Sequence, residues 1–293
     1  MRYSIAFAAA ALASSVSAHG VITQVQGANG VNMPGLSVID GTPRDSGNPL
    51  SGSEADTSII RAKEMGGKAS ALGRTQGGGP VDAAAAISTF MGTGAAGGAA
   101  AAANTKRGLL DALTGGAGGA GGAAGGAAAS AAGTKTPKGT SETGVAAAAG
   151  QGASQGLPTT ADDGTITMTF HQVNQDGAGP LKAQIDATSG GTDPAAFQDA
   201  TVTQDVPGIG IGGLSAAAVM DFPVKVQMPQ GMTCSGTAGG AQNVCIVRMQ
   251  NAALAGPFGG SAAFTQSTAA KKRAVEYNLR KRHMARGILG KPE

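Results

Sequence analysis

The sequence contains no tryptophan, only two tyrosines and only three histidines among its 293 residues. Aromatic side chains make up 3% of the chain, whereas glycine alone accounts for 50 residues, so bulky side chains are scarce. Because large apolar side chains supply most of the area that a protein buries, we expect the packed part to be smaller than the chain length suggests. The composition therefore predicts one core of moderate size.

Long apolar runs and broad basic regions are also missing. The apolar run at residues 5–12 is too short to span a bilayer, which takes ~20 residues. The formal net charge is only +3, and much of the basic excess lies in residues 271–293. Because nucleic-acid binding needs a broad basic face, the sequence predicts no nucleic-acid partner, and it predicts no transmembrane segment.

The N-terminus has the pattern of a secretory signal peptide. Residues 1–18 carry Arg2 near the start, continue with the apolar run and end in the small residues Ser17 and Ala18. Cleavage after Ala18 would make His19 the first residue of the mature chain. We therefore expect a secreted, extracellular protein.

Two cysteines, Cys234 and Cys245, lie in a region rich in Gly, Ser and Thr. In an exported protein, a pair with this spacing predicts a disulfide across a hairpin or loop. The alternative, two reduced thiols in a core, requires a reducing compartment.

Short strand-like segments between Gly and Pro turns dominate the rest of the chain. They lie at residues 19–25, 165–173, 181–187, 200–206, 221–228 and 244–250. This pattern predicts an all-β fold, an immunoglobulin-like β-sandwich over residues 19–270 with long loops and short helices. One helix is expected from an N-cap at Asp82 to Met91, and a short one at residues 57–63.

Two segments differ from this pattern. Residues 92–156 consist largely of Gly and Ala, which predicts a disordered low-complexity insertion with at most a short helix near residues 106–113. It would be either a tolerated surface insertion or an elastic or wall-associating linker. Residues 271–293 form a basic tail with dibasic pairs ending at Arg273 and Arg282. A solvated tail, processing by a protease and attraction to anionic wall polymers are the alternatives for it.

The three histidines are His19, His171 and His283, and the last lies in the basic tail. After cleavage, His19 would offer its imidazole and its α-amine, and His171 would add a third nitrogen. Three such donors suit Cu(II). The alternatives are that His19 merely follows a cleavage site and that His171 is a hydrogen-bonded surface residue.

Longer motifs support a resemblance to a known family. These motifs are residues 19–22, 40–45, 73–77, 170–180, 256–260 and 280–290. With them the chain resembles the Egh-type secreted virulence factors of plant- and insect-pathogenic fungi, which are associated with appressorium formation and host penetration. The resemblance covers nearly all of the chain after residue 18 outside the Gly/Ala insertion.

That family is similar in layout to lytic polysaccharide monooxygenases, copper enzymes built on an immunoglobulin-like β-sandwich. The resemblance implies a histidine brace of His19 and His171, with Phe258 or, less favourably, Phe264 in the axial position. It also implies copper-dependent oxidation of chitin or a related cell-wall polysaccharide. The alternative is a non-enzymatic effector or adhesion protein that binds copper, polysaccharide or a host surface component. Polar residues after the second histidine are candidates for orienting it: Gln172, Asn174, Gln175 and Asp176.

Overall fold

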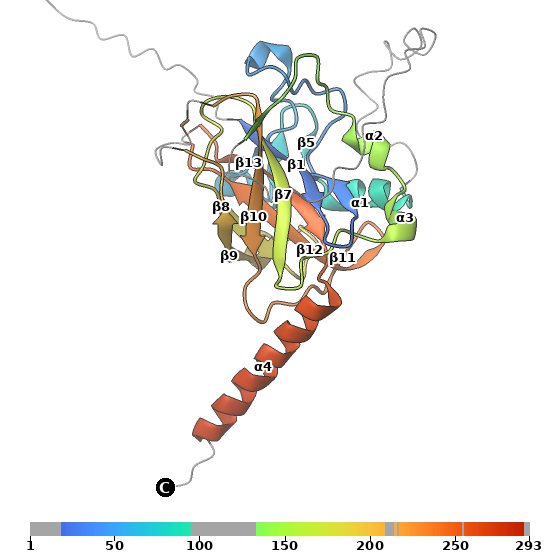
Figure 1. Ribbon diagram of the computed structural model, residues 1–293, viewed down its shortest axis with the longest axis vertical. Coiled ribbons are helices and arrows are strands. Elements are labelled where there is room, and N and C mark those ends of the chain that lie inside the picture. Colours follow the sequence, from blue (N-terminus) through green and yellow to red (C-terminus); the bar gives the residue numbers. More distant parts are fainter. Residues whose placement is uncertain (1–18, 95–132, 209–213, 216, 254, 290–293) are drawn as a thin grey trace, which may run out of the picture.

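The computed structural model describes residues 19–94, 133–208, 214–215, 217–253 and 255–289, which Figure 1 shows as a β-rich body with one projecting helix. The expected signal peptide at residues 1–18 and the expected helix near residues 106–113 lie outside these ranges.

Antiparallel strands form the body of the protein. The longer ones are β1 (Gly20–Gln26), β7 (Thr165–Gln172), β8 (Lys182–Asp186), β9 (Phe197–Gln204), β10 (Met220–Gln227), β12 (Ala241–Gln250) and β13 (Phe258–Phe264). The shorter ones are β2 (Asn32–Pro34), β3 (Ser58–Ile59), β4 (Arg74–Thr75), β5 (Gly79–Pro80), β6 (Thr134–Lys135) and β11 (Gly236–Ala238). Hydrogen bonding joins them in the order β2-β1-β7-β10-β9-β8-β12-β13-β3-β4-β5, with β11 on β12 and β6 on β10. This arrangement confirms the predicted all-β, sandwich-like fold.

The curled sheet brings its two halves face to face around one core. A Cβ added to Gly260 in β13 would lie 2.6 Å from the backbone nitrogen of Ile22 in β1, so the two strands pack at very close range. Side chains such as Ile22, Phe170 and Val224 are fully or almost fully buried between the layers. In β7 the alternation works as predicted, because Ile166, Met168 and Phe170 are buried while the intervening threonines are half-exposed.

Helix α1 (Ala83–Met91) matches its prediction. The Asp82 carboxylate accepts a hydrogen bond from Ala85 N at 3.0 Å, and Gly92 ends the helix with φ of 68°. The helix expected at residues 57–63 is wrong: this segment contains β3, followed by a single 3-10 turn at Ala62–Glu64. Ile59 pairs with Phe258 of β13, so pairing between distant segments outweighs the local helical preference.

The predicted disordered insertion does not extend to residue 156. Residues 133–156 contain β6, α2 (Gly144–Ala148) and α3 (Gly152–Gln155). They have few large apolar side chains, but β6 pairs with β10, and Glu142 binds the buried guanidinium of Arg44. Anchoring to the body thus replaces the apolar burial that the segment lacks. Residues 95–132 lie outside the described part of the chain.

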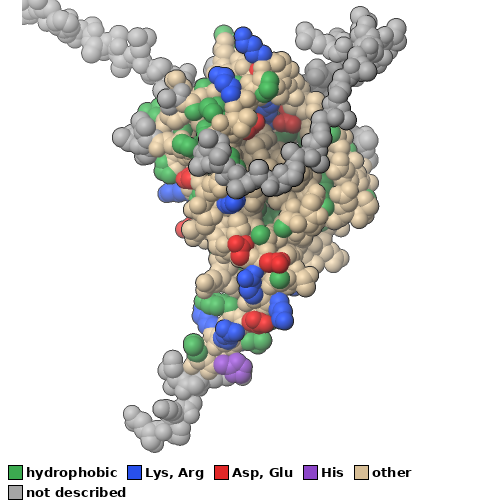
Figure 2. Space-filling model, in the orientation of Figure 1, with side chains coloured by type: hydrophobic (Ala, Val, Ile, Leu, Met, Phe, Trp, Pro, Cys, Tyr) green, Lys and Arg blue, Asp and Glu red, His purple; other side chains and the backbone are tan. Residues whose placement is uncertain are grey.

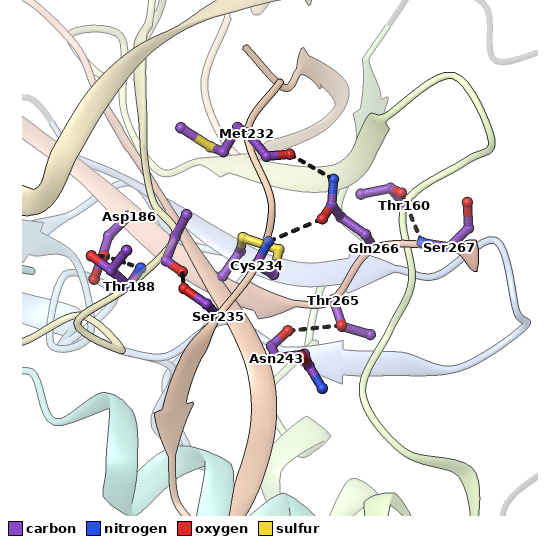
Figure 3. The surroundings of a disulfide bond; sticks show 12 residues. Thr160, Asp186, Thr188, Met232, Cys234, Ser235, Asn243, Thr265, Gln266 and Ser267 are labelled. Carbon is purple, nitrogen blue, oxygen red and sulfur yellow. Dashed lines mark hydrogen bonds between the residues drawn. A yellow bond between two sulfur atoms is a disulfide. The ribbon is translucent and has the colours of Figure 1, made fainter. Parts of the chain in front are cut away.

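The predicted disulfide between Cys234 and Cys245 is confirmed, with a Cα–Cα distance of 5.1 Å. Cys245 belongs to β12, and Cys234 lies in the segment that leads into β11. Figure 3 shows how Gln266 supports it: Cys234 N donates to Gln266 Oε1, and Gln266 Nε2 donates to the carbonyl of Met232. The bridge therefore stabilises the end of the sandwich from which the C-terminal helix starts.

The basic tail is largely a helix, α4 (Thr268–Leu289), which projects away from the sandwich in Figure 1. Ala270 and Ala274 are buried against the body, and Asn278 Nδ2 donates to the carbonyl of Gly231 at 2.8 Å. No helix among the described residues has both the length and the apolar character needed to cross a membrane.

Candidate functional site

His171 lies near the end of β7 and is 1% exposed. Its strand partner in β10 is Asp221, whose Oδ1 lies 2.7 Å from His171 Nδ1. The other ring nitrogen, Nε2, is buried and has no hydrogen-bond partner among the described residues. A carboxylate at Nδ1 favours the tautomer with its proton there, which leaves a lone pair on Nε2. The surface alternative for His171 is therefore wrong, and its Nε2 is a candidate metal ligand.

His19 directly precedes β1 and is 2% exposed. Its backbone nitrogen donates to Asn174 Oδ1 at 3.0 Å, and its Nδ1 lies 3.0 Å from Glu54 Oε1. That contact is at ion-pair distance but outside hydrogen-bonding geometry, and both ring nitrogens of His19 are buried without a hydrogen-bond partner in the described chain. Asn174 Nδ2 donates to the same Glu54 oxygen at 3.1 Å, so the three residues form one cluster.

Phe258 packs directly against His19. The two ring centroids are 4.5 Å apart and the planes are tilted by 35°. Asn251 positions this phenylalanine, because its Oδ1 accepts a hydrogen bond from Phe258 N at 3.0 Å. Phe264, at the other end of β13, belongs to the main apolar core instead. Of the two phenylalanines considered from the sequence, Phe258 is the one that contacts a candidate ligand.

Strand pairing brings the two histidines to neighbouring positions. Val21 pairs with His171 and Gly20 with Gln172, and Val173 N donates to the carbonyl of His19 at 3.0 Å, which places His19 opposite Val173, two positions beyond the first pair. His19 and His171 are therefore diagonal neighbours across an antiparallel pair, for which Cα atoms lie roughly 7–8 Å apart. Residues far apart in the sequence thus meet at one end of the β1-β7-β10 layer.

Polar residues after His171 shape the surroundings of the site. Gln172 is fully buried, and its Nε2 donates to the carbonyls of Asn174 and Ala217 and to Ser215 Oγ. Asp176 lies near His19: partial burial raises the pKa of its carboxyl group, while the charge of His19 acts in the opposite direction. Gln175 contributes its backbone carbonyl, which accepts from Ser215 N. These contacts fix the loop that follows β7.

The ring nitrogens of His171 and His19 meet some of the requirements of a site for one copper ion. Nε2 of His171 is buried and unpartnered, and its Nδ1 is held by a carboxylate, the usual arrangement of a metal-binding histidine. The Glu54 carboxylate beside His19 Nδ1 would favour a cation there, although it also competes for that nitrogen. Among the described residues, no three side chains of His, Cys, Asp or Glu are grouped so that they could hold a metal ion. A histidine brace would not need a group of three, because it uses two histidine side chains together with the terminal amine.

Sequence reasoning missed two members of this cluster, Glu54 and Asp221. They stand 35 and 50 positions from the histidines that they contact. No local motif marks either residue. The β10 register and the loop before β3 bring them to the site, so only the folded chain identifies them.

Comparisons with known proteins show which family the chain matches. Residues 17–259 match the family model described as Egh16-like virulence factor. The chain is 60% identical over 290 residues to the appressoria-specific virulence factor GAS2 of Pyricularia oryzae, covering 98% of this chain and 97% of that protein. It is 39% identical over 129 residues to the appressoria-specific virulence factor GAS1 of the same fungus, covering 43% of this chain and 50% of that protein. No solved structure matches.

Proposed function

The chain belongs to the Egh16-like virulence factor family, and we propose that it is a secreted fungal protein that acts at a wall or host surface during penetration by binding copper through His19 and His171. A virulence-associated role follows from the family itself. The names of the two relatives place them in appressoria, the structures with which such fungi enter a host, and this supports a role at that stage.

The observation that carries the copper proposal is the state of His171. Asp221 occupies Nδ1 at 2.7 Å, while the buried Nε2 has no partner in the described chain. A buried nitrogen without a hydrogen bond costs free energy, about 1–3 kcal/mol, unless a ligand uses it. His19 directly precedes the neighbouring strand β1 and would contribute its Nδ1 and, after cleavage behind Ala18, its α-amine.

The surrounding side chains would hold this site in place. Asp221 would favour a proton on His171 Nδ1, Asn174 contacts the backbone of His19, the Glu54 carboxylate lies beside its ring, and Phe258 would keep water from one side of that ring. Phe258 has no ligand atom, so it would not itself bind the metal. When bound, copper would supply one-electron chemistry with O₂ or H₂O₂ for hydrogen abstraction from a sugar C–H bond, chitin or a related wall polysaccharide being the proposed substrate.

The proposal is tested first for copper binding and then for oxidation of a polysaccharide. For binding, mass spectrometry of the secreted protein should show His19 as its first residue, and calorimetric titration should show one Cu(II) per chain. The His171→Ala variant should lose this binding, while the control His283→Ala, on the exposed helix α4, should retain it. The loaded protein should then release oxidised oligosaccharides from chitin in the presence of a reductant. Copper binding that His171→Ala leaves intact would overturn the site.

The non-enzymatic alternative is favoured by one observation. The sequence has no tryptophan, and its two tyrosines are Tyr3, at residues 1–18, and Tyr277, on α4. Among the residues that the structure describes, the candidate site therefore has no tyrosine or tryptophan platform of the kind that could lie flat on a crystalline polysaccharide. Copper binding without oxidised products would assign the protein to this second class, an effector or adhesion protein that binds copper, polysaccharide or a host surface component.

A further inference from the structure

Helix α4 carries a charge opposite to that of the rest of the chain. Its 22 residues include seven Lys or Arg and a single Glu, a formal net charge of +6. Because the whole chain has a net charge of +3, the residues outside α4 together carry −3. The sequence thus concentrates its positive charge on one helix.

This helix presents its charge to the surroundings rather than to the body. Figure 2 shows Lys and Arg side chains gathered along the projecting helix. The basic side chains Lys271, Lys272, Arg273, Arg280, Lys281 and Arg282 are all exposed. The first three turns contact the body through Ala270, Ala274 and Asn278. An isolated helix end is marginally stable in water, so a ligand that neutralises its positive charges would stabilise it.

The base of the helix also lines a cleft. A cavity of about 510 Å³ lies between α4 and the segment around residues 227–232. Arg273 and Arg280 line it, seven residues apart and therefore on one side of the helix. Asp163 and Glu276 also line the cleft; the Asp163 carboxylate accepts a hydrogen bond from Thr165 N at 2.8 Å, and hydrogen bonding to Thr165 together with the charge of Arg273 lowers its pKa. Asp163 therefore offsets part of the charge of Arg273, and basic side chains line both the cleft and the open side of α4.

Several carboxylates of the body already have partners and are therefore poorly placed to pair with this helix in a second copy. Asp56 and Glu142 bind Arg44, and Glu64 binds both Arg61 and Arg74. The Asp186 carboxylate is fully buried. Because these negative groups are already engaged, the charge on α4 fits an anion supplied from outside.

The arrangement of apolar side chains argues against a membrane surface. Successive helical residues are 100° apart, so Val275 and Leu279 lie on one side of α4, while Tyr277 and Met284 lie on the opposite side. A helix that lies on a membrane needs one continuous apolar face. Single-stranded nucleic acid is also a poor match, because its bases stack on aromatic rings and Tyr277 is the one Phe, Tyr or Trp residue in the α4 sequence.

We propose that α4 and the cleft at its base bind a linear acidic polysaccharide, a polymer whose repeated carboxylates meet basic side chains on several sides of the helix. The binding site lies at the opposite end of β7 from His171, since Asp163 and Gly164, which line the cleft, directly precede this strand. It does not depend on copper at the histidines. Its role is to hold the protein on an anionic wall polymer.

Affinity electrophoresis in gels containing polygalacturonate tests this site with the full mature chain. The test variant carries Lys272→Gln, Arg280→Gln, Lys281→Gln and Arg282→Gln. The matched control carries four equivalent changes on exposed lysines of the body: Lys63→Gln, Lys68→Gln, Lys138→Gln and Lys182→Gln. We expect the helix variant to lose at least about tenfold in affinity and the control less than about twofold. Binding by the wild type should weaken as salt rises, because exposed charges are screened.

Several results would overturn the proposal. Equal losses in both variants would show that only overall charge matters, and equal binding of neutral xylan would remove the role of the carboxylates. Tighter binding to duplex DNA or to vesicles containing phosphatidylserine would assign the helix to another class of partner. A salt-sensitive dimer in sedimentation that disappears in the helix variant would assign it to a second copy. Circular dichroism of the helix variant checks that α4 persists, which we expect because glutamine is a good helix former. The salt dependence of binding by the wild type tests the role of charge without any variant.

Discussion

At the scale of single residues, the Asp221 carboxylate determines which ring nitrogen of His171 could bind a metal. Its Oδ1 lies 2.7 Å from Nδ1, which favours a proton on Nδ1 and a lone pair on Nε2. In Asp221→Asn the carboxylate is lost, and the amide can donate to Nδ1 and favour the other tautomer. Loss of such a supporting contact costs about 10- to 100-fold in metal affinity, which we expect for Cu(II) measured by calorimetric titration.

A matched control for this change is Asp199→Asn. Asp199 is exposed on β9, where Gln184 Nε2 donates to its carboxylate at 2.9 Å, away from both histidines. Its substitution should leave Cu(II) affinity unchanged. Equal affinities in all three proteins would show that Asp221 does not support a metal ligand.

Asp186 is a buried carboxylate whose charge is stabilised by the turn that follows β8. Burial favours its neutral form, but hydrogen bonds from Ser189, Thr188 and Gly191 outweigh burial and hold the pKa of Asp186 below its usual value. Because the folded pKa is the lower one, this contribution to stability is present above the unfolded pKa of about 3.9 and is lost as pH falls through the folded pKa.

The pH dependence of unfolding tests this assignment. Asp186→Asn should be less stable than the wild type near neutral pH, and the difference in the free energy of unfolding should shrink as pH falls below about 4. Urea unfolding at a series of pH values measures it. A difference that stays constant or grows towards low pH would contradict a stabilised carboxylate at this position.

At the scale of elements, strand β13 depends on the absence of side chains at two positions. A Cβ on Gly259 would lie 2.0 Å from the carbonyl oxygen of Met249, and one on Gly260 would lie 2.6 Å from Ile22 N. Both neighbours are backbone atoms, which cannot move aside without disturbing the sheet. The close approach of β13 to β1 also keeps Phe258 against His19.

We expect Gly260→Ala to lower the free energy of unfolding by about 1–3 kcal/mol, as overpacking of a core does. Gly67→Ala is the control, because the nearest atom to its added Cβ is 3.8 Å away. That change should be nearly neutral. Urea unfolding followed by circular dichroism measures both, and equal stability of the two variants would show that β1 and β13 can separate at little cost.

At the scale of the whole molecule, Arg44 joins segments that are distant in the sequence. Its guanidinium binds Asp56 and Glu142 together, and its side chain is only 5% exposed. Burial opposes its charge, but the two carboxylates outweigh burial and raise the pKa of Arg44. This cluster ties residues 133–156 to the loop that carries Glu54, next to His19.

The change Arg44→Gln should therefore cost about 3–5 kcal/mol in the free energy of unfolding, because it leaves two carboxylates without their buried partner. The control Arg74→Gln removes an ion pair to Glu64 in which the arginine side chain is 28% exposed, and should cost less than about 1 kcal/mol. Chemical denaturation measures both changes. A cost for Arg44→Gln as small as that of the control would contradict a stabilising role for the cluster.

Local features of the sequence were enough to predict a structural feature where the whole pattern lies within one segment. The alternation of Ile166, Met168 and Phe170 predicted β7, and Asp82 predicted the start of α1. The spacing of Cys234 and Cys245 predicted their disulfide. These are effects of side-chain period, capping and loop length, which act over a few residues. Strand β13 was missed because its Gly and Ala residues have little strand preference and are set by packing against β1.

The sequence by itself drew attention to His19 and His171, because histidine is rare in this chain, and the family resemblance added Phe258. Only the tertiary structure decided that His171 is buried, that Phe258 rather than Phe264 contacts His19, and that Asp221 and Glu54 accompany the histidines. The physical reason is that strand pairing and the path of the loop before β3 bring these groups together across 35 to 239 residues of chain, a range over which no local pattern acts.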